Sequence, residues 1–191
     1  MTTVASSRQL KLAAQKHHLI FHETPVGFKY FAPFFQDAIN TNGIAIGVES
    51  SGGMSISSHT LEKCGFIPGI ILLSIIKETG LSLSQLKHRV ESRYGKTCFM
   101  EKELHFSPHQ KPLLMDIFNS ASTDLLASHF DQPLESLLRT DGLKLLFEST
   151  DWLLFRFSGT EPLARIYCES NNDETSHALI TQAQQFLSSL L

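Results

Sequence analysis

The sequence predicts an α/β protein with two domains: a three-layer α/β/α domain with a mainly parallel sheet, followed by a small α+β domain with an antiparallel sheet and two helices. Strand-like and helix-like segments alternate through about the first 80 residues, which favours a mainly parallel sheet covered on both faces. Near the carboxyl end, strand-like runs follow one another with only turns between them, which is typical of antiparallel strands. We expect the domains to cover residues 1–94 and 95–191.

The elements of the first domain follow from capping residues and apolar runs. Ser7 can cap a helix from Arg8 to His17, and Pro33 fits the first turn of a helix that we expect from Tyr30 to Asn40. The other expected elements are a short β-prone piece at Thr3–Ser6, a buried strand at Leu19–His22, a strand at Gly43–Val48, a loop at Ser50–Thr60 and a helix at Gly65–Thr79. This last helix is apolar nearly all round, so we expect it to be central and well buried.

The elements of the second domain are set out by similar signals. Ser82 can cap a helix that runs to Tyr94 just before the domain boundary, and Asp141-Gly142 opens a hairpin. The further expected elements are a strand at Lys96–Phe106, a helix at Pro108–Asn119, hairpin strands at Leu143–Glu148 and Trp152–Phe157, a strand at Leu163–Glu169 and an amphipathic helix at Asn172–Leu191.

Composition excludes several classes of partner. The formal net charge is −3 with a pI near 6.3, and no basic cluster is present, so neither nucleic acid nor an anionic membrane surface is an expected partner. No apolar run approaches the length needed to span a membrane, and the first residues lack the pattern of a signal peptide. We therefore expect a cytoplasmic protein.

The cysteines and histidines give little support for a metal site. Cys64, Cys98 and Cys168 are far apart in the sequence and odd in number, so reduced thiols are the default. The cluster His17, His18 and His22 invites a structural zinc hypothesis, but these residues straddle the end of one expected element and the start of the next. Because no matching cysteines or carboxylates accompany them, we expect no metal ligands in this chain.

The most informative segment is the loop at residues 156–165, between two strand-like runs. Arg156 and Arg165 flank it, and both can form bidentate hydrogen bonds to phosphate oxygens. Ser158, Gly159 and Thr160 supply hydroxyls and successive backbone N–H groups that can converge on an anion. From these residues alone, a phosphate clamp and a polar hairpin tip with two surface arginines both remain open.

Two further loops are expected at one edge of the first sheet. The segments Thr24–Lys29 and Glu49–Gly53 each follow an expected parallel strand. Since ligands bind beyond the carboxyl ends of parallel strands, both loops should face the same crevice.

Four motifs in order resemble those of the alpha-D-phosphohexomutase family, which includes phosphoglucomutase and phosphomannomutase. They are Thr24-Pro25-Val26-Gly27-Phe28-Lys29, Glu49-Ser50-Ser51-Gly52-Gly53, Glu62-Lys63-Cys64-Gly65, and Arg156-Phe157-Ser158-Gly159-Thr160-Glu161-Pro162 with Arg165. The resemblance covers essentially the whole chain and implies the carboxy-terminal half of such an enzyme, with the third family domain at 1–94 and the fourth at 95–191. These enzymes are isomerases of carbohydrate metabolism that act as intramolecular phosphotransferases.

The resemblance implies a role for each site residue. Gly27, Glu49, Ser51 and Lys63 would hold the sugar, and Arg156, Ser158, Gly159, Thr160 and Arg165 would hold the phosphate that is not reacting. Gly53 stands where the bacterial dual-specificity enzymes have histidine, which tilts the expected substrate towards glucose phosphate. Hinge closure between the two domains is expected to assemble the site.

The family's chemical parts are missing from this sequence. It contains no Asp-x-Asp-x-Asp magnesium loop and no serine followed by His-Asn-Pro, so the resemblance assigns no catalytic residue to this chain. Mg²⁺ and hexose 1,6-bisphosphate are expected for the complete enzyme only, and a partner half would carry the serine and magnesium loops. We expect this chain alone to be inactive; the alternatives are a phosphosugar-binding module without chemistry, a subunit of a split mutase, or a purely structural domain.

Overall fold

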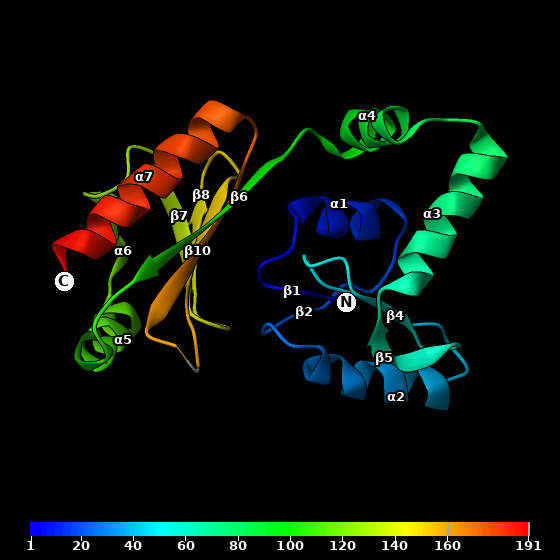
Figure 1. The fold of residues 1–191 in the computed structure, drawn as a ribbon, viewed down its shortest axis with the longest axis horizontal. Helices are drawn as coiled ribbons and strands as arrows, with labels where there is room; N and C mark the ends of the chain where they lie inside the picture. The colour runs from blue at the N-terminus through cyan, green and yellow to red at the C-terminus, as the bar shows by residue number, and fades with distance from the viewer. Residues whose placement is uncertain (160, 191) are drawn as a thin grey trace. The chain divides into compact units, whose positions relative to one another are not determined.

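The computed structural model describes residues 1–159 and 161–190. The chain divides into two compact units, Met1–Gly95 and Lys96–Leu191, and each is described by itself (Figure 1). Unit 1 holds a sheet with helices, and unit 2 holds an antiparallel sheet with helices. The predicted fold class is therefore confirmed.

The sheet of unit 1 is mixed, with strand order β2-β1-β3-β4-β5. Its strands are β1 (Thr2–Thr3), β2 (Glu23–Thr24), β3 (Ile46–Val48), β4 (Met54–Ile56) and β5 (Thr60–Cys64). The central strand β1 pairs in parallel with β2 and β3, whereas β4 and β5 add an antiparallel edge. The expected loop at Ser50–Thr60 was wrong, because this segment turns back on itself and its backbone pairs with β3.

The two helices of unit 1 that have a serine cap, α1 and α4, begin where these capping residues predict. The helix expected from Tyr30 instead begins as a 3₁₀ turn at Phe28 and becomes an α-helix at Ala32. They are α1 (Arg8–Lys16), the 3₁₀ helix η1 (Phe28–Phe31), α2 (Ala32–Asn40), α3 (Phe66–Thr79) and α4 (Leu83–Tyr94). The Ser7 side chain accepts a hydrogen bond from the Gln9 backbone N–H at the start of α1. Ser82 and Gln85 form a capping box that satisfies two backbone donors of α4. In Figure 1, α1 and α2 lie on opposite faces of the sheet.

One face of the sheet packs closely against α2. Phe31 and Phe35 are fully buried. A Cβ atom at Gly47 on β3 would lie 2.7 Å from the Phe31 ring, so the absence of a side chain there allows the ring to approach the strand. This contact fixes β3, whose carboxyl end leads into the Glu49–Gly53 loop.

Two expectations of burial in unit 1 were wrong. Leu19 and Ile20 were expected in a buried strand, but they are 63% and 86% exposed, and the strand of this segment that pairs with β1 is Glu23–Thr24. Helix α3 was expected to be central, but none of its residues is buried. An apolar sequence shows that a helix has no polar face, but it does not specify which surface covers that helix.

The sheet of unit 2 is antiparallel throughout, with strand order β6-β10-β9-β8-β7. Its strands are β6 (Cys98–His105), β7 (Leu134–Leu138), β8 (Leu143–Phe147), β9 (Trp152–Phe157) and β10 (Leu163–Ser170). Its helices are η2 (Pro108–Gln110), α5 (Lys111–Ser120), α6 (Thr123–Ala127) and α7 (Asp173–Ser189). Sequence patterns missed β7 and α6, which span five residues each, and the expected end of α7 at Leu191 lies outside the described residues.

The core of unit 2 lies between one face of this sheet and the helices α5 and α7. Leu153 and Phe155 on β9 face this core, and Arg156 lies on the other face, because side chains alternate along a strand. Phe118 of α5 packs its ring edge-on against Phe155 at 5.0 Å between centroids. Because these inner residues are fully or almost fully buried, they hold β9 firmly where it enters the 158–162 loop.

All three cysteines are free thiols, and Cys168 lies in the core of unit 2. Burial raises the pKa of the Cys168 thiol to about 12, so this thiol is neutral near pH 7. Among the described residues, no single helix is long and apolar enough to cross a membrane. By length and composition only the bent pair α3 and α4 qualifies, with 92° between its helices.

We predict that a substitution in the core of unit 1 lowers the free energy of unfolding much more than a substitution on helix α3. Phe35→Ala removes a fully buried ring and should lower the free energy of unfolding by about 3–5 kcal/mol. Ile70→Ala removes a side chain that is 64% exposed and should change it by no more than about 0.5 kcal/mol. Urea unfolding followed by circular dichroism measures both; a loss above about 2 kcal/mol for Ile70→Ala would show that α3 is buried in solution.

Candidate functional site

The candidate site residues of unit 1 lie at one edge of its sheet. In the parallel register, Thr24 at the end of β2 is opposite Thr3, and Val48 at the end of β3 is opposite Thr2. The carboxyl ends of β2 and β3 therefore meet on either side of β1. Gly27 follows the first of these strands and Glu49 follows the second.

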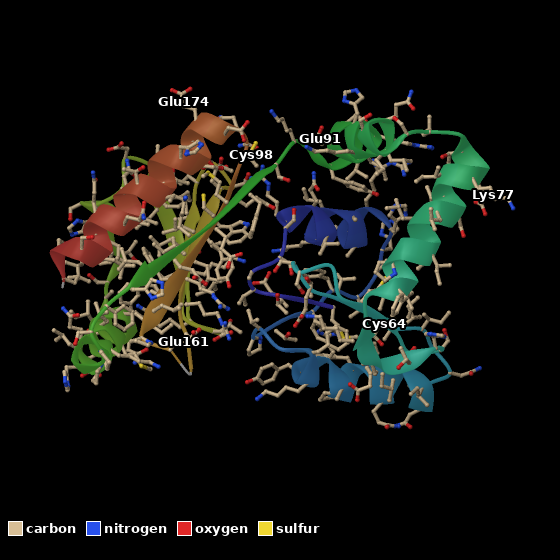
Figure 2. The ribbon with its side chains drawn as sticks, in the orientation of Figure 1. Cys64, Lys77, Glu91, Cys98, Glu161 and Glu174 are labelled. Atoms are coloured by element: carbon tan, nitrogen blue, oxygen red, sulfur yellow. The ribbon has the colours of Figure 1, made fainter. Side chains whose placement is uncertain are left out.

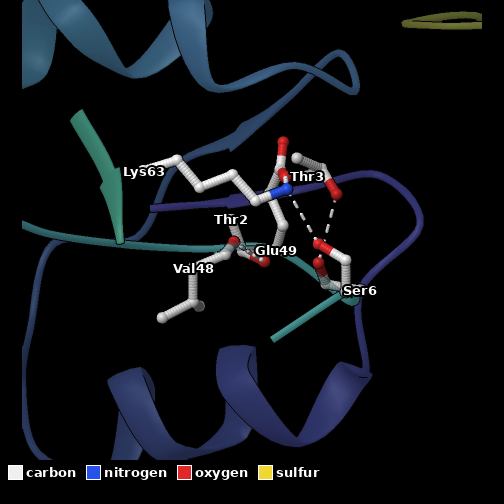
Figure 3. A network of polar contacts seen from close by, with 7 residues as sticks. Thr2, Thr3, Ser6, Val48, Glu49 and Lys63 are labelled. Carbon is white, nitrogen blue, oxygen red and sulfur yellow. Dashed lines mark hydrogen bonds and ion pairs between the residues drawn. The ribbon is translucent and has the colours of Figure 1, made fainter. Parts of the chain in front are cut away.

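Lys63 reaches from β5 to the Glu49–Gly53 loop (Figure 3). Its Nζ atom lies 2.6 Å from Glu49 Oε2 and 3.0 Å from Ser51 Oγ. The Glu49 side chain is 10% exposed and the Lys63 side chain is 45% exposed. The structure thus brings together three residues that the resemblance assigned separately to the sugar, and it presents an acceptor, a hydroxyl and an ammonium group as one cluster.

The backbone of the Glu49–Gly53 loop closes on itself. The Glu49 N–H donates to Gly53 O, and the Gly52 N–H donates to Glu49 O, both at 3.0 Å. Gly52 has a φ of +84°, which favours glycine. A Cβ atom at Gly53 would overlap the aliphatic stem of Lys63, so this glycine gives Lys63 room to cross the loop.

Strand β1 is hydrogen bonded to the residue that precedes this loop. Thr2 Oγ1 donates to Val48 O at 3.1 Å, directly before Glu49. The Thr3 and Ser6 hydroxyls are hydrogen bonded at 3.2 Å where the chain leaves β1 (Figure 3). Gly27 lies in the neighbouring loop, immediately before η1, with a φ of +136°.

The candidate site of unit 2 lies at the turn between β9 and β10. Arg156 and Arg165 are direct register partners on these two strands, so both side chains point to the same face of the sheet. Glu161 lies at the tip of the connecting loop (Figure 2). Ser158 and Gly159 lie between the arginines, whereas Thr160 lies outside the described residues. Like charges directly opposite one another are unfavourable, so this pair needs compensation.

Two carboxylates provide this compensation, and sequence patterns did not identify either. Arg156 Nε lies 2.8 Å from Asp141 Oδ2, and Arg165 Nε lies 2.9 Å from Glu103 Oε1. The hydrogen bond to Glu103 raises the pKa of Arg165, which therefore stays charged. Both ion pairs use the Nε atom, and each guanidinium has further donors on its Nη atoms that these two pairs do not use. Asp141 and Glu103 therefore orient the arginines.

Hydrogen bonds within unit 2 also hold the loop itself. The Ser158 N–H donates to Leu163 O at 2.9 Å, and the Glu161 N–H donates to Ser158 Oγ at 3.2 Å. Lys111 Nζ, at the first residue of α5, donates to Ser158 O at 2.5 Å. Sequence patterns gave no signal for Lys111, because it is 47 residues away from the loop and carries no motif of its own.

No group of three or more His, Cys, Asp or Glu that could hold a metal ion occurs among residues 1–159 and 161–190. In the histidine cluster considered for zinc, His17 Nε2 contacts the Tyr94 hydroxyl at 3.1 Å. His22 stacks on Phe34 with ring centroids 4.3 Å apart.

Comparison with known proteins finds a family model that matches unit 1 and relatives that cover both units. Residues 1–94 match the family described as phosphoglucomutase/phosphomannomutase, alpha/beta/alpha domain III. A phosphomannomutase from Mycoplasma genitalium is 28% identical, covering 97% of this chain and 35% of the relative. A phosphoglucosamine mutase from Kineococcus radiotolerans is 30% identical, covering 93% of this chain and 33% of the relative. The chain thus spans about a third of the length of the curated relatives it matches.

Solved structures agree at the level of the fold. The exocytosis-sensitive phosphoprotein pp63/parafusin from Paramecium, a phosphoglucomutase, superposes with a TM-score of 0.72 at 19% identity. This match covers 99% of this chain and 37% of that chain. Both units are therefore included in the shared fold.

We predict that the hairpin leading to Arg156 depends on Gly142. Gly142 has a φ of +88°, and a Cβ atom there would overlap the Phe155 carbonyl oxygen. Gly142→Ala should therefore lower the free energy of unfolding by more than about 2 kcal/mol. Gly159→Ala is the matched control, because a Cβ atom at Gly159 has nothing within 4 Å and should be tolerated. Thermal melts of both variants measure the difference, and equal melting temperatures would contradict the prediction.

Proposed function

Because this chain belongs to the alpha-D-phosphohexomutase family and corresponds to the carboxy-terminal part of its members, we propose that it is the substrate-binding part of a mutase. The proposed reaction interconverts hexose 1-phosphate and hexose 6-phosphate, with glucose as the preferred hexose. The observation that carries the proposal is the pairing of Arg156 with Arg165 across two neighbouring strands, on either side of a loop in which Gly159 and Glu161 are exposed.

The proposed role of the unit 2 loop is to hold the phosphate that is not reacting. A phosphate dianion between Arg156 and Arg165 would offset the repulsion of two adjacent guanidinium groups, and planar guanidinium groups match phosphate oxygens bidentately. Ser158 and Gly159 add a hydroxyl and a backbone N–H group to the same anion, since Ser158 Oγ accepts from the Glu161 N–H and can still donate its own hydrogen. Thr160 is proposed as the third contact of this type.

The proposed role of the unit 1 loop is to hold the sugar ring. Glu49 offers carboxylate oxygens that accept from ring hydroxyls, and Ser51 offers a hydroxyl that both donates and accepts. Lys63 already contacts both side chains, so it supports their position and carries a charge complementary to a phosphosugar. Gly27 is proposed as a backbone contact from the adjacent loop.

A mutase needs a phosphate grip that works in two substrate orientations. Its intermediate is phosphorylated at both ends, so either phosphate must fit the same loop. Arginines and backbone N–H groups recognise charge and tetrahedral shape, and neither depends on which carbon carries the phosphate. The proposed grip therefore differs from a site that contacts each hydroxyl of the sugar ring.

The phosphoryl-transfer chemistry is proposed to lie in an amino-terminal part that carries the serine and magnesium loops. This sequence contains neither loop. We propose that Mg²⁺ is held by that magnesium loop and by no residue of this chain. Hexose 1,6-bisphosphate is the expected intermediate of the complete enzyme.

We predict that substitutions at Arg156 and Glu49 affect the binding of inorganic phosphate and of glucose 1-phosphate differently. Arg156→Ala should weaken the binding of both inorganic phosphate and glucose 1-phosphate by roughly 10- to 100-fold, because a hydrogen bond to a charged group contributes about 1.5–3 kcal/mol. Glu49→Gln should weaken glucose 1-phosphate by roughly tenfold and leave inorganic phosphate unchanged. Isothermal titration calorimetry of the full chain measures both constants.

The control for this experiment is Arg89→Ala, which removes an exposed arginine on α4 and keeps the same net charge as Arg156→Ala. Both ligands should bind this control as they bind the unchanged chain. Phosphate binding that is equally weak in both arginine variants would contradict a specific phosphate grip at Arg156 and support a purely structural loop.

We also predict that the pure chain does not interconvert glucose 1-phosphate and glucose 6-phosphate, even with Mg²⁺ and glucose 1,6-bisphosphate present. The reason is that the chain can position the substrate but lacks the nucleophile and the metal ion, which provide most of the rate acceleration of phosphoryl transfer. A coupled dehydrogenase assay measures glucose 6-phosphate directly. Turnover by the pure chain would overturn this part of the proposal, whereas binding without turnover fits both a mutase part and a stand-alone phosphosugar-binding module.

A further inference from the structure

Lys111 links the start of helix α5 to the candidate phosphate loop. Its Nζ atom donates to the Ser158 carbonyl oxygen at 2.5 Å, and this contact is partly buried. Lys111 is the first residue of α5, whose Leu114 and Phe118 side chains are buried in the core of unit 2. The ammonium group is therefore held by a helix that is itself anchored.

Because the peptide group is planar, the contact at the Ser158 carbonyl also sets the direction of the Gly159 N–H group. No cis peptide bond occurs in the described chain. In a trans peptide the C=O and N–H groups point in opposite directions. Fixing the Ser158 carbonyl towards Lys111 therefore turns the Gly159 N–H away from Lys111, to the other side of the loop.

The Ser158 N–H, the Ser158 hydroxyl oxygen and the Glu161 N–H are already engaged inside unit 2. The Ser158 N–H donates to Leu163 O, and Ser158 Oγ accepts from the Glu161 N–H. Among the described residues, no acceptor is found for the Gly159 N–H, and Gly159 is exposed with nothing within 4 Å of its Cβ position. The orientation of this one N–H group thus depends on the peptide that Lys111 holds.

We propose that Lys111 is a positioning residue of the phosphate loop, which fixes the Ser158–Gly159 peptide so that the Gly159 N–H faces the bound phosphate. This inference rests on the proposed function of the loop. The ammonium group does not itself contact the anion; it acts through the peptide. An unrestrained Ser158–Gly159 peptide would rotate, and its carbonyl oxygen would then repel a phosphate for part of the time.

The test uses the full 191-residue chain, labelled with ¹⁵N and titrated with inorganic phosphate. In the unchanged chain the Gly159 amide resonance should shift on binding. Lys111→Met should weaken phosphate binding by roughly tenfold or more and reduce the shift of the Gly159 amide at saturation, since one hydrogen bond to a charged ligand is lost. Lys111→Arg keeps a cationic donor and should restore both values.

Lys102→Met is the matched control, because it removes one lysine charge from β6 of the same unit at an exposed position. It should leave both the affinity and the Gly159 shift unchanged. Equal weakening by Lys102→Met, or an unchanged Gly159 shift in Lys111→Met, would overturn the role of Lys111. Absence of any phosphate-induced shift between Arg156 and Leu163 in the unchanged chain would instead overturn the proposed phosphate grip, and the inference with it.

Discussion

The register of β9 against β10 is the constraint on which the candidate phosphate site depends. Phe155 pairs with Ile166, and both side chains enter the core of unit 2. Because side chains alternate between the two faces of a strand, the next pair, Arg156 with Arg165, must lie together on the other face. A slip by one residue would move the arginines to the core side and the apolar residues out of it. The hydrophobic core thus enforces a juxtaposition of two positive charges that electrostatics alone would oppose.

Ion pairs within unit 2 offset the repulsion between Arg156 and Arg165 when no ligand is bound. Asp141 and Glu103 each engage one arginine through its Nε atom, and in unit 1 Glu49 engages Lys63 through its Nζ atom. These pairs are partly exposed, so each contributes little to the free energy of unfolding. Their value lies in orientation: a side chain held by a neighbour loses less conformational freedom when a ligand binds. In both loops the charged groups that we propose for binding are therefore ordered before a ligand arrives.

The sequence predicts contacts within a motif better than contacts between elements. The caps at Ser7 and Ser82 depend on neighbouring residues, and the structure has them as expected. Glu103 and Lys111 escaped notice because their contacts with the loop cross 62 and 47 residues, so only the fold brings them there. The wrong prediction of a buried α3 has a different cause. An apolar composition shows that a helix lacks a polar face, but it does not show where in the fold the helix lies. The family motifs could be located from sequence, but the groups that orient them could not.

The character of the loops explains why a binding part without chemistry is a coherent unit. Phosphoryl transfer needs a nucleophile and a metal at the reacting end of the sugar, whereas the other end needs only to be held. A grip at that end must tolerate two substrate orientations, and it does so best with groups that read charge and shape. In the grip that we propose, arginines oriented by carboxylates and a backbone N–H oriented by a lysine all come from one small sheet domain. A surface hairpin without a ligand has no need for two adjacent arginines that are held by carboxylates through Nε and keep further Nη donors outside these pairs, and this arrangement favours the phosphate grip over the structural alternative.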